Sequence, residues 1–469
     1  MITASYENAR TLAAALGISE EHAERLLDVE VAVTVDSCHI VGLRLATDLQ
    51  QLLRRTVRSV TLTPQPYTQP AVEVVVGNAT PVTSAPIVWV NLTAAGLTIS
   101  STRSWKGDMG DVHPSLVFLS ACYTAGAAIR LVVGHAFPLP FSDPLVVNFS
   151  ELFGPDLSWM SEPIELGELY LAGAGAIGNG FLWVLRHFPV RGILHIADPD
   201  TVSDGNLNRC LWFSASDVGA YKADRLASLA QPYFSLLRLV PEGMSLWDVA
   251  AAKQGGPWLK RLIVGVDSRR ARRNLQLEIP GEVFDASTTG IAEIVLHHHH
   301  APSDAACLSC IYVQEEGELT HEIHVAEALG VSLDDVRMLY VSHQAARKIG
   351  LRYSQLQSQY LVGLAYDSLF KQLCGQGALQ IAADRQVLAP FGFVSVLAGT
   401  YLALECVYRV QRKRQELRFN YWRASPWCSP MLQLRVRRPK HRRCEFCGQE
   451  TLQEVTTQFW GAAVEIEHN

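Results

Sequence analysis

Three closely spaced glycines could bring the protein backbone against a phosphate group. They are Gly173, Gly175 and Gly178. An apolar run at residues 169–172 precedes them and predicts a buried strand, and a helical pattern follows at residues 181–187. In such a strand–turn–helix unit the N–H groups at the start of the helix point toward the ligand, and glycines leave room for it.

A carboxylate follows the glycines at the distance that a nucleotide site needs. Asp198 stands twenty residues after Gly178, at the end of a further expected strand at residues 193–197. Its oxygens could accept hydrogen bonds from the ribose hydroxyls of a nucleotide. A nicotinamide-dependent dehydrogenase would show the same features, and a glycine-rich turn without a ligand is also open at this point.

A polar cluster further along the chain separates these alternatives. It consists of Asn206, Arg209, Lys222 and Asp267. A dehydrogenase has no use for such a cluster. A site that cleaves ATP at the α-phosphate does, because Arg and Lys stabilise charge on the phosphate and on the leaving pyrophosphate, and an Asp can hold Mg²⁺. We interpret their polar neighbours as capping or supporting residues and the adjacent thiol as a packed side chain: Asp200, Asp204, Asn208 and Cys210.

Four cysteines in two tight pairs predict a metal site. The pairs are Cys307 with Cys310 and Cys444 with Cys447, and four thiolates are the ligand set of a closed tetrahedral Zn²⁺. Zinc would join the C-terminal segment to the nucleotide domain and would have no open position for catalysis. Two unconnected pairs are the alternative. The histidine run at residues 297–300 could bind metal, but a polar turn is the interpretation we favour.

Bulk composition limits the class of protein. The chain has 469 residues, of which 48% are hydrophobic and 18% charged, so it can bury more than one core and is not a disordered chain. Its net charge of −6 argues against a general nucleic-acid binder. No apolar run approaches the length of a membrane span, and the N-terminal residues lack the pattern of a secretory signal. We therefore expect a cytoplasmic protein without nucleic-acid or membrane partners.

Helical and strand patterns alternate along the chain and predict an α/β fold. Residues 1–158 form one expected domain, with a long small-residue helix at 113–130 and a loop or linker from 137 to 163. Residues 159–469 form the second, a Rossmann-like nucleotide domain interrupted by a helical insertion at about 312–385.

The second domain resembles the ubiquitin-activating-enzyme superfamily, which includes the adenylyltransferases that activate the sulfur carriers of thiamine and molybdopterin synthesis. The match is close over residues 168–285 and looser over the cysteine pairs and residues 391–405. In that family a glycine loop, a strand-end Asp, an Asn-Leu-x-Arg run, a Lys and a later Asp form the ATP site. Here these positions are Gly173, Gly175, Gly178, Asp198, Asn206, Arg209, Lys222 and Asp267.

The resemblance implies ATP-dependent adenylation of the C-terminal carboxylate of a ubiquitin-like protein, with ATP, Mg²⁺ and Zn²⁺ as cofactors. It also implies that a cysteine then captures the acyl group as a thioester for a conjugating enzyme. Cys374, in a glycine-bearing stretch after the helical insertion, is the residue we expect in that role. An adenylyltransferase for a sulfur carrier or peptide, without a thioester, is the alternative, and a scaffold without catalysis is a further one. Similar bacterial operons imply a role in phage defence.

The N-terminal domain has the rhythm of an adenylation domain without its glycine loop. Family enzymes work as dimers or as fused pairs, so we expect a degenerate, inactive adenylation-like domain that forms an internal pseudo-dimer, with a further homodimer left open. An unrelated substrate-recruiting module is the alternative. In the family an arginine of the opposite half often reaches ATP, and the two candidates here are Arg10 and Arg103.

Overall fold

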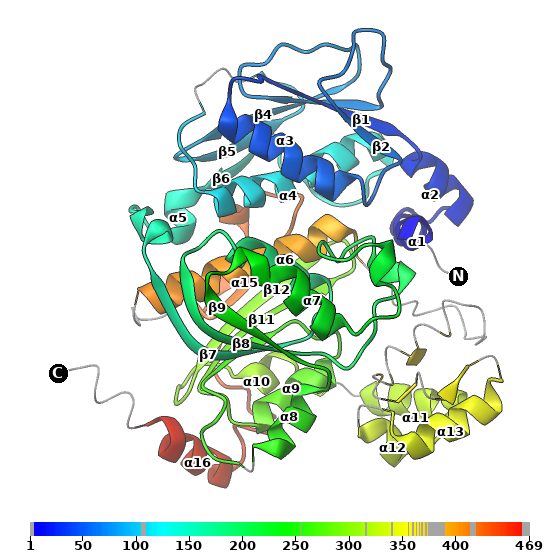
Figure 1. The fold of residues 1–469 in the computed structure, drawn as a ribbon, viewed down its shortest axis with the longest axis vertical. Helices are drawn as coiled ribbons and strands as arrows, with labels where there is room; N and C mark the ends of the chain where they lie inside the picture. Colours follow the sequence, from blue (N-terminus) through cyan, green and yellow to red (C-terminus); the bar gives the residue numbers. More distant parts are fainter. Residues whose placement is uncertain are drawn as a thin grey trace.

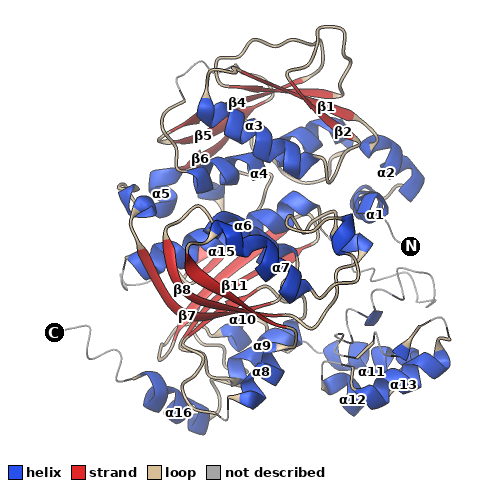
Figure 2. Ribbon diagram, in the orientation of Figure 1, coloured by secondary structure: helices blue, strands red, loops and turns tan. Residues whose placement is uncertain are grey.

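Two β-sheets with helices packed between them form the body of the molecule in a computed structural model (Figure 1, Figure 2). The structure describes residues 4–104, 109–253, 255–314, 317–338, 341–354, 390–412 and 419–461, with part of residues 356–373. The α/β fold class predicted from the sequence is confirmed.

The larger sheet carries the glycine loop. Its strands lie in the order β14-β13-β12-β11-β10-β7-β8-β9. The contacts from β9 to β11 are parallel, and those from β11 to β14 are antiparallel. The bounds are β7 Ile164–Ala172, β8 Val190–Ala197, β9 Leu236–Glu242, β10 Arg261–Val264, β11 Glu282–Thr289, β12 Glu293–His300, β13 Tyr421–Ala424 and β14 Arg435–Val436.

Helices cover both faces of this sheet. On the inner face lie α6 (Ala176–Leu185), α7 (Lys222–Ala230) and α15 (Gly392–Gln411). The opposite face carries α8 (Leu246–Ala252), α9 (Arg269–Leu277), α10 (Leu308–Ile311) and α16 (Glu450–Trp460), as Figure 2 shows. Parallel strands joined through helices bring the polar loops at their carboxyl ends to one edge of the sheet.

A smaller sheet belongs to the N-terminal part. Its order is β2-β1-β3-β4-β5-β6, with parallel contacts from β2 to β4 and antiparallel contacts from β4 to β6. The bounds of its elements are α1 Ala4–Leu16, α2 Glu20–Leu27, β1 Glu30–Val35, α3 Ile40–Leu53, β2 Ser59–Leu62, β3 Val72–Val76, β4 Ile87–Thr93, β5 Gly96–Ser100, α4 Pro114–Val133, β6 Leu145–Asn148 and α5 Phe149–Phe153.

The smaller sheet repeats the plan of the larger one. Three parallel contacts followed by two antiparallel contacts relate β2-β1-β3-β4-β5-β6 to β8-β7-β10-β11-β12-β13. In each half a helix follows the strand that comes first in the chain: α3 follows β1, and α6 follows β7. A 20-residue helix precedes the last of these strands, α4 before β6 and α15 before β13. The edge strand β9 has no counterpart among the described residues of the N-terminal half.

The equivalent helices meet between the sheets. α4 packs on α3 and α15, and α15 packs on α6. Tyr123 and Tyr401 each occupy the tenth position of their helix, and their buried hydroxyls lie 2.7 Å apart. Two corresponding side chains in contact with each other are what a pseudo-twofold relation between the halves requires.

α4 and α15 also correct one expectation from the sequence. By length and composition both helices could cross a membrane, whereas the sequence analysis expected no apolar run of that size. In each, 78% of the apolar window is buried inside the molecule. Their apolar surfaces therefore pack in the core between the two sheets.

Two other sequence interpretations were wrong in part. The segment at 137–163, expected to be a loop or linker, contains β6, which pairs with β5, and the short helix α5. The histidine run at 297–300 is not a turn but the end of strand β12, with His297, His298 and His299 buried. Pairing with β11 and β13 explains why so many imidazoles can be enclosed.

The expected helical insertion has a small core of its own. α11 (Glu318–Leu329), α12 (Leu333–Arg337) and α13 (His343–Arg352) enclose a separate apolar cluster that includes Val325, Leu329 and Ile349. Ion pairs attach it to α9, one between Arg270 and Glu322 at 2.9 Å and one between Arg273 and Glu318 at 2.6 Å.

Candidate functional site

The glycine turn joins β7 to α6 at the carboxyl edge of the larger sheet. Gly173 has a φ of +101°, which favours glycine, and a Cβ there would lie 3.0 Å from the carbonyl of Gly265. A Cβ on Gly178 would lie only 2.2 Å from the carbonyl oxygen of Gly173. Gly175 differs, because a Cβ there would meet nothing within 4 Å. Two glycines are thus required by packing, while the third faces open space at the helix N-terminus.

Asp198 lies directly beside this turn. Its Oδ2 accepts a hydrogen bond from the N–H of Ala174 at 2.7 Å, and its Oδ1 accepts one from the N–H of Asp200 at 2.9 Å. The side chain is 6% exposed. Asp198 therefore links the end of β8 to the glycine turn, which is the position expected for a group that receives ribose hydroxyls beside a phosphate loop.

Lys222, the first residue of α7, completes a charged group with two carboxylates. Its Nζ donates to Asp200 Oδ2 at 2.8 Å. Burial opposes the charge of Lys222, but Asp200 and Asp198 outweigh it and raise the pKa of this ammonium. Burial raises the pKa of Asp198 to about 6, against the attraction of Lys222.

Asp200 supports Lys222, which is one of the two roles, capping or supporting, expected for it from the sequence. It holds Lys222 through Oδ2, while its Oδ1 is buried and has no hydrogen-bond partner among the described residues. A buried carboxylate oxygen without a partner is costly unless a further donor or cation meets it. This orphaned atom beside the glycine turn fits a polar ligand such as a nucleotide with its metal ion.

Asn206 and Arg209 come from a 3₁₀ turn, η3 (Asp204–Asn206), and the loop after it. The Oδ1 of Asn206 accepts from the N–H of Ser203 at 3.0 Å, which closes the turn. Arg209 Nη1 donates to the carbonyl of Gly205 at 2.7 Å and to Oδ1 of Asn208 at 2.8 Å. Burial raises the pKa of the adjacent Cys210 thiol, and the charges of Arg209 and Lys222 oppose that rise.

Asp267 reaches the same edge from β10. The loop that carries it begins at Gly265, whose N–H donates to the carbonyl of Ala172 at 2.9 Å, the residue before the glycine turn. The Asp267 side chain is exposed, and its charge acts on the neighbouring Arg272. The predicted ATP-site residues thus come from three connections at this edge of the sheet, those that follow β7, β8 and β10.

Asn179 supports the site although the sequence reading did not single it out. This residue of α6 is completely buried. Its Nδ2 donates to the carbonyls of Ala174 and Gly175 at 2.9 and 3.0 Å, and its Oδ1 accepts from the N–H of Trp212 at 3.1 Å. One amide therefore joins the glycine turn to the loop of Arg209. A lone polar residue inside an apolar helix was the available signal.

The four predicted metal ligands lie together below the sheet. Their Sγ atoms are separated by 3.7 Å (Cys307 and Cys310), 3.6 Å (Cys307 and Cys444), 3.6 Å (Cys310 and Cys447) and 3.5 Å (Cys447 and Cys307). A tetrahedral zinc with Zn–S bonds of about 2.3 Å requires edges of about 3.8 Å. N–H groups of His441 and Cys447 donate to Sγ of Cys310 and Cys444, as expected for thiolates. The donor set fits Zn²⁺.

Comparison with known families decides the class. Residues 164–446 match the model of the ThiF family, and this range is more than half of the chain. The chain belongs to the ThiF family. Residues 1–154 match the model described as the E1 N-terminal domain, which supports the resemblance to ubiquitin-activating enzymes stated from the sequence.

One similar protein and one solved structure add little about the role of this ThiF-family chain. "Uncharacterized protein y4jF" from Sinorhizobium fredii is 27% identical over 309 residues, which cover 61% of this chain and 58% of that protein. The match thus spans less than two thirds of that relative. A solved structure titled "Crystal Structure of SeMet PaaA" is 19% identical over 28% of this chain and 40% of that one, with a TM-score of 0.23, too low to support any argument.

The remaining predicted residues of the ThiF-family chain are placed unequally. Cys374 lies outside the described residues. Arg10 lies on α1, which contacts η3, and it pairs with Glu7 at 3.2 Å. Arg103 follows β5, where its N–H donates to Ser100 Oγ at 3.2 Å. Of the two arginines, the structure therefore places Arg10 on the helix beside the Arg209 loop.

Proposed function

We propose that this protein binds ATP at the glycine turn and transfers AMP to the C-terminal carboxylate of a ubiquitin-like protein. The observation that carries the proposal is the convergence of three strand–helix connections at one sheet edge, with a glycine turn, two cations and three carboxylates. Single features of this set occur in other nucleotide-binding proteins, but the two cations together suit α-phosphate cleavage.

Each residue has a task in this reaction. Asp198 receives the ribose hydroxyls, and the N–H groups at the start of α6 face the phosphates. The carboxylate oxygen of the partner attacks the α-phosphorus, and the bond to the pyrophosphate oxygen breaks. Arg209 and Lys222 offset the charge that builds on the phosphate and on the leaving pyrophosphate. Asp267 would hold the magnesium ion that accompanies ATP.

A thioester step follows in the proposal. Cys374 attacks the carbonyl carbon of the acyl-adenylate, AMP leaves, and the thioester passes to the cysteine of a conjugating enzyme. Zinc on the four cysteines would only hold the C-terminal segment in place, because four protein ligands close its coordination sphere. The N-terminal half serves as an inactive partner of the catalytic half, because its β1–α3 connection, residues 36–39, contains no glycine.

Pyrophosphate exchange tests the adenylation step. The protein is mixed with ATP, labelled pyrophosphate and a ubiquitin-like protein ending in glycine. Exchange should occur with the unaltered chain and with Asp224→Ala, an exposed carboxylate on α7, and should be lost in Asp267→Ala. Exchange that survives Asp267→Ala would refute the site assignment.

A non-reducing gel separates the proposed activator from a sulfur-carrier adenylyltransferase. A thiol-sensitive adduct with the partner should form and should vanish in Cys374→Ala, while Cys38→Ala, which removes an exposed thiol elsewhere, retains it. Adenylation without any adduct would favour the sulfur-carrier alternative, since the ATP site and the cysteine cluster suffice for it.

A further inference from the structure

The loop that carries Arg209 is held by side chains of the N-terminal half. Asn208, which is 1% exposed, accepts from the Arg209 guanidinium through Oδ1 at 2.8 Å. Its Nδ2 donates to Oδ1 of Asn8 at 3.0 Å. Asn8 belongs to α1 and lies 200 residues away in the chain. The orientation of the Arg209 side chain is therefore connected directly to the N-terminal half.

The amide of Asn8 is itself fixed. Its Nδ2 donates to the backbone carbonyl of Arg55 at 2.6 Å, so its Oδ1 must face Asn208. Asn8 is 2% exposed, and rotation of its amide would leave two buried groups unpaired. Each group in this chain thus donates to the next in one direction, from Arg209 through Asn208 and Asn8 to the carbonyl of Arg55.

Arg55 also binds the Arg209 loop directly, through its guanidinium. It follows α3, and its Nη1 donates to the carbonyl of Leu207, while its Nη2 donates to the carbonyls of Leu211 and Phe213, at 3.0 and 3.4 Å for Nη2. These carbonyls flank Arg209 on both sides. One planar guanidinium that meets three carbonyls restrains the curvature of the loop in a way that an ammonium does not.

We propose that Asn8 and Arg55 are positioning residues that hold Arg209 ready for the phosphate of ATP. The inference rests on the proposed function for the role of Arg209 but goes beyond it. It gives the N-terminal half a task in the reaction, since without that half the loop at 207–213 loses four of its anchoring hydrogen bonds. Neither residue is required to touch ATP.

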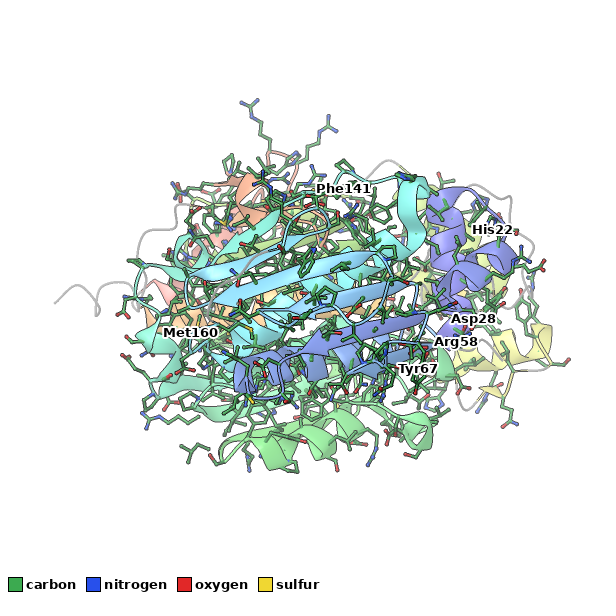
Figure 3. The ribbon with its side chains drawn as sticks, turned by 90° about the horizontal axis from the view of Figure 1, so that it is seen from above. His22, Asp28, Arg58, Tyr67, Phe141 and Met160 are labelled. Atoms are coloured by element: carbon green, nitrogen blue, oxygen red, sulfur yellow. The ribbon has the colours of Figure 1, made fainter. Side chains whose placement is uncertain are left out.

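Hydrogen exchange tests the positioning by itself, in the full chain and without any activity. Asn8→Ala and Arg55→Gln should raise amide exchange in peptides covering residues 203–213 by about tenfold. Arg58→Gln is the matched control, because Arg58 lies three residues from Arg55 but pairs with Asp28 at the surface, at 3.7 Å (Figure 3). Unchanged exchange in both Asn8→Ala and Arg55→Gln would overturn the proposal.

Pyrophosphate exchange then tests whether the positioning serves Arg209. Asn8→Ala should lower kcat by about 10- to 100-fold, with a smaller change in KM for ATP, because a displaced group loses transition-state contacts first. Arg55→Lys should not restore the rate, and Arg58→Gln should leave it unchanged. In Arg209→Ala the further change Asn8→Ala should have no effect on kcat.

The outcomes separate this inference from the proposed function. If the unaltered chain fails to exchange pyrophosphate, the proposed function fails, while hydrogen exchange still decides whether Asn8 and Arg55 order the loop. If exchange occurs but the effects of Asn8→Ala and Arg209→Ala multiply, Asn8 acts elsewhere and the inference is wrong. If the Asn8→Ala and Arg55→Gln variants melt at a lower temperature but show a normal kcat when assayed 20 °C below that temperature, these residues have a purely structural role and the inference is wrong.

Discussion

Gly175→Ala should separate nucleotide binding from folding. Gly175 has φ −73° and precedes α6 as its N-cap, so alanine fits the backbone there, and no atom lies within 4 Å of the added Cβ. Alanine is a poorer N-cap than glycine but restricts the unfolded chain, so the net change in the free energy of unfolding should stay within about 1 kcal/mol.

The effect on ATP should be much larger. The methyl group would occupy the space where a phosphate approaches the N–H groups of α6. Losing one hydrogen bond to a charged group costs about 1.5–3 kcal/mol, which corresponds to about 12- to 150-fold weaker ATP binding. Gly178→Ala is the contrasting variant, because its Cβ would lie 2.2 Å from the Gly173 carbonyl oxygen. It should lose both binding and about 1–3 kcal/mol of stability.

Two measurements decide this prediction. Isothermal titration with ATP and Mg²⁺ gives the affinity, and urea denaturation gives the stability of each variant. The unaltered chain and Gly178→Ala serve as the two references for affinity and stability. Gly134→Ala is unsuitable as a control, because the φ of Gly134, +69°, would strain any side chain. Normal ATP affinity in a folded Gly175→Ala would refute the placement of the phosphates at this turn.

Three further predictions concern stability. Tyr123→Phe or Tyr401→Phe alone leaves one buried hydroxyl unpaired and should cost about 1–3 kcal/mol in urea denaturation, whereas the double variant should be nearly neutral. Tyr67→Phe is the control, because Tyr67, labelled in Figure 3, is 81% exposed. Additive losses in the double variant would contradict the contact. Asp48→Asn removes a buried carboxylate whose pKa is raised to about 6 from 3.8. Because the folded protein holds that proton more tightly, the ionised carboxylate lowers the free energy of unfolding by about 3 kcal/mol above pH 6. The variant should therefore be more stable there, and its advantage should disappear as pH falls toward 3.8. An advantage that is independent of pH would contradict this prediction. Zinc analysis should find one ion per chain, and Cys444→Ser should lose this ion. Its loss should weaken the docking of α16, where Trp460 Nε1 donates to the carbonyl of Ile279 at 2.9 Å, and so change the tryptophan fluorescence. Metal-free protein with unchanged tryptophan fluorescence would refute the structural role.

Secondary structure was predictable where apolar periodicity was strong. The patterns over β7, β8 and α4 identified these elements because burial on one face or both dictates residue type. The histidines of β12 misled the reading, because polar side chains in a central strand depend on partners from elsewhere. His298, for example, is paired with Glu282 of β11 at 3.1 Å, and His297 with the carbonyl of Ala306 at 2.9 Å.

The residues of the candidate ATP site and the cysteine pairs were readable from type and spacing, because phosphate turns need glycines and tetrahedral zinc needs four thiolates in close pairs. The supporting residues were not readable. Asn8 and Arg55 are ordinary in sequence, and even Asn179, the lone polar residue of an apolar helix, gains its task only from contacts with the glycine turn and the Arg209 loop.

The sequence by itself determined the chemistry of the candidate site, because that chemistry depends on which groups are present and in what order. Only the tertiary structure decided how the two halves of the chain contact each other. Its contacts join Tyr123 to Tyr401 and Asn8 to Asn208 across 278 and 200 residues. Such pairs follow from the packing of two similar sheets around shared helices, and no local pattern encodes them.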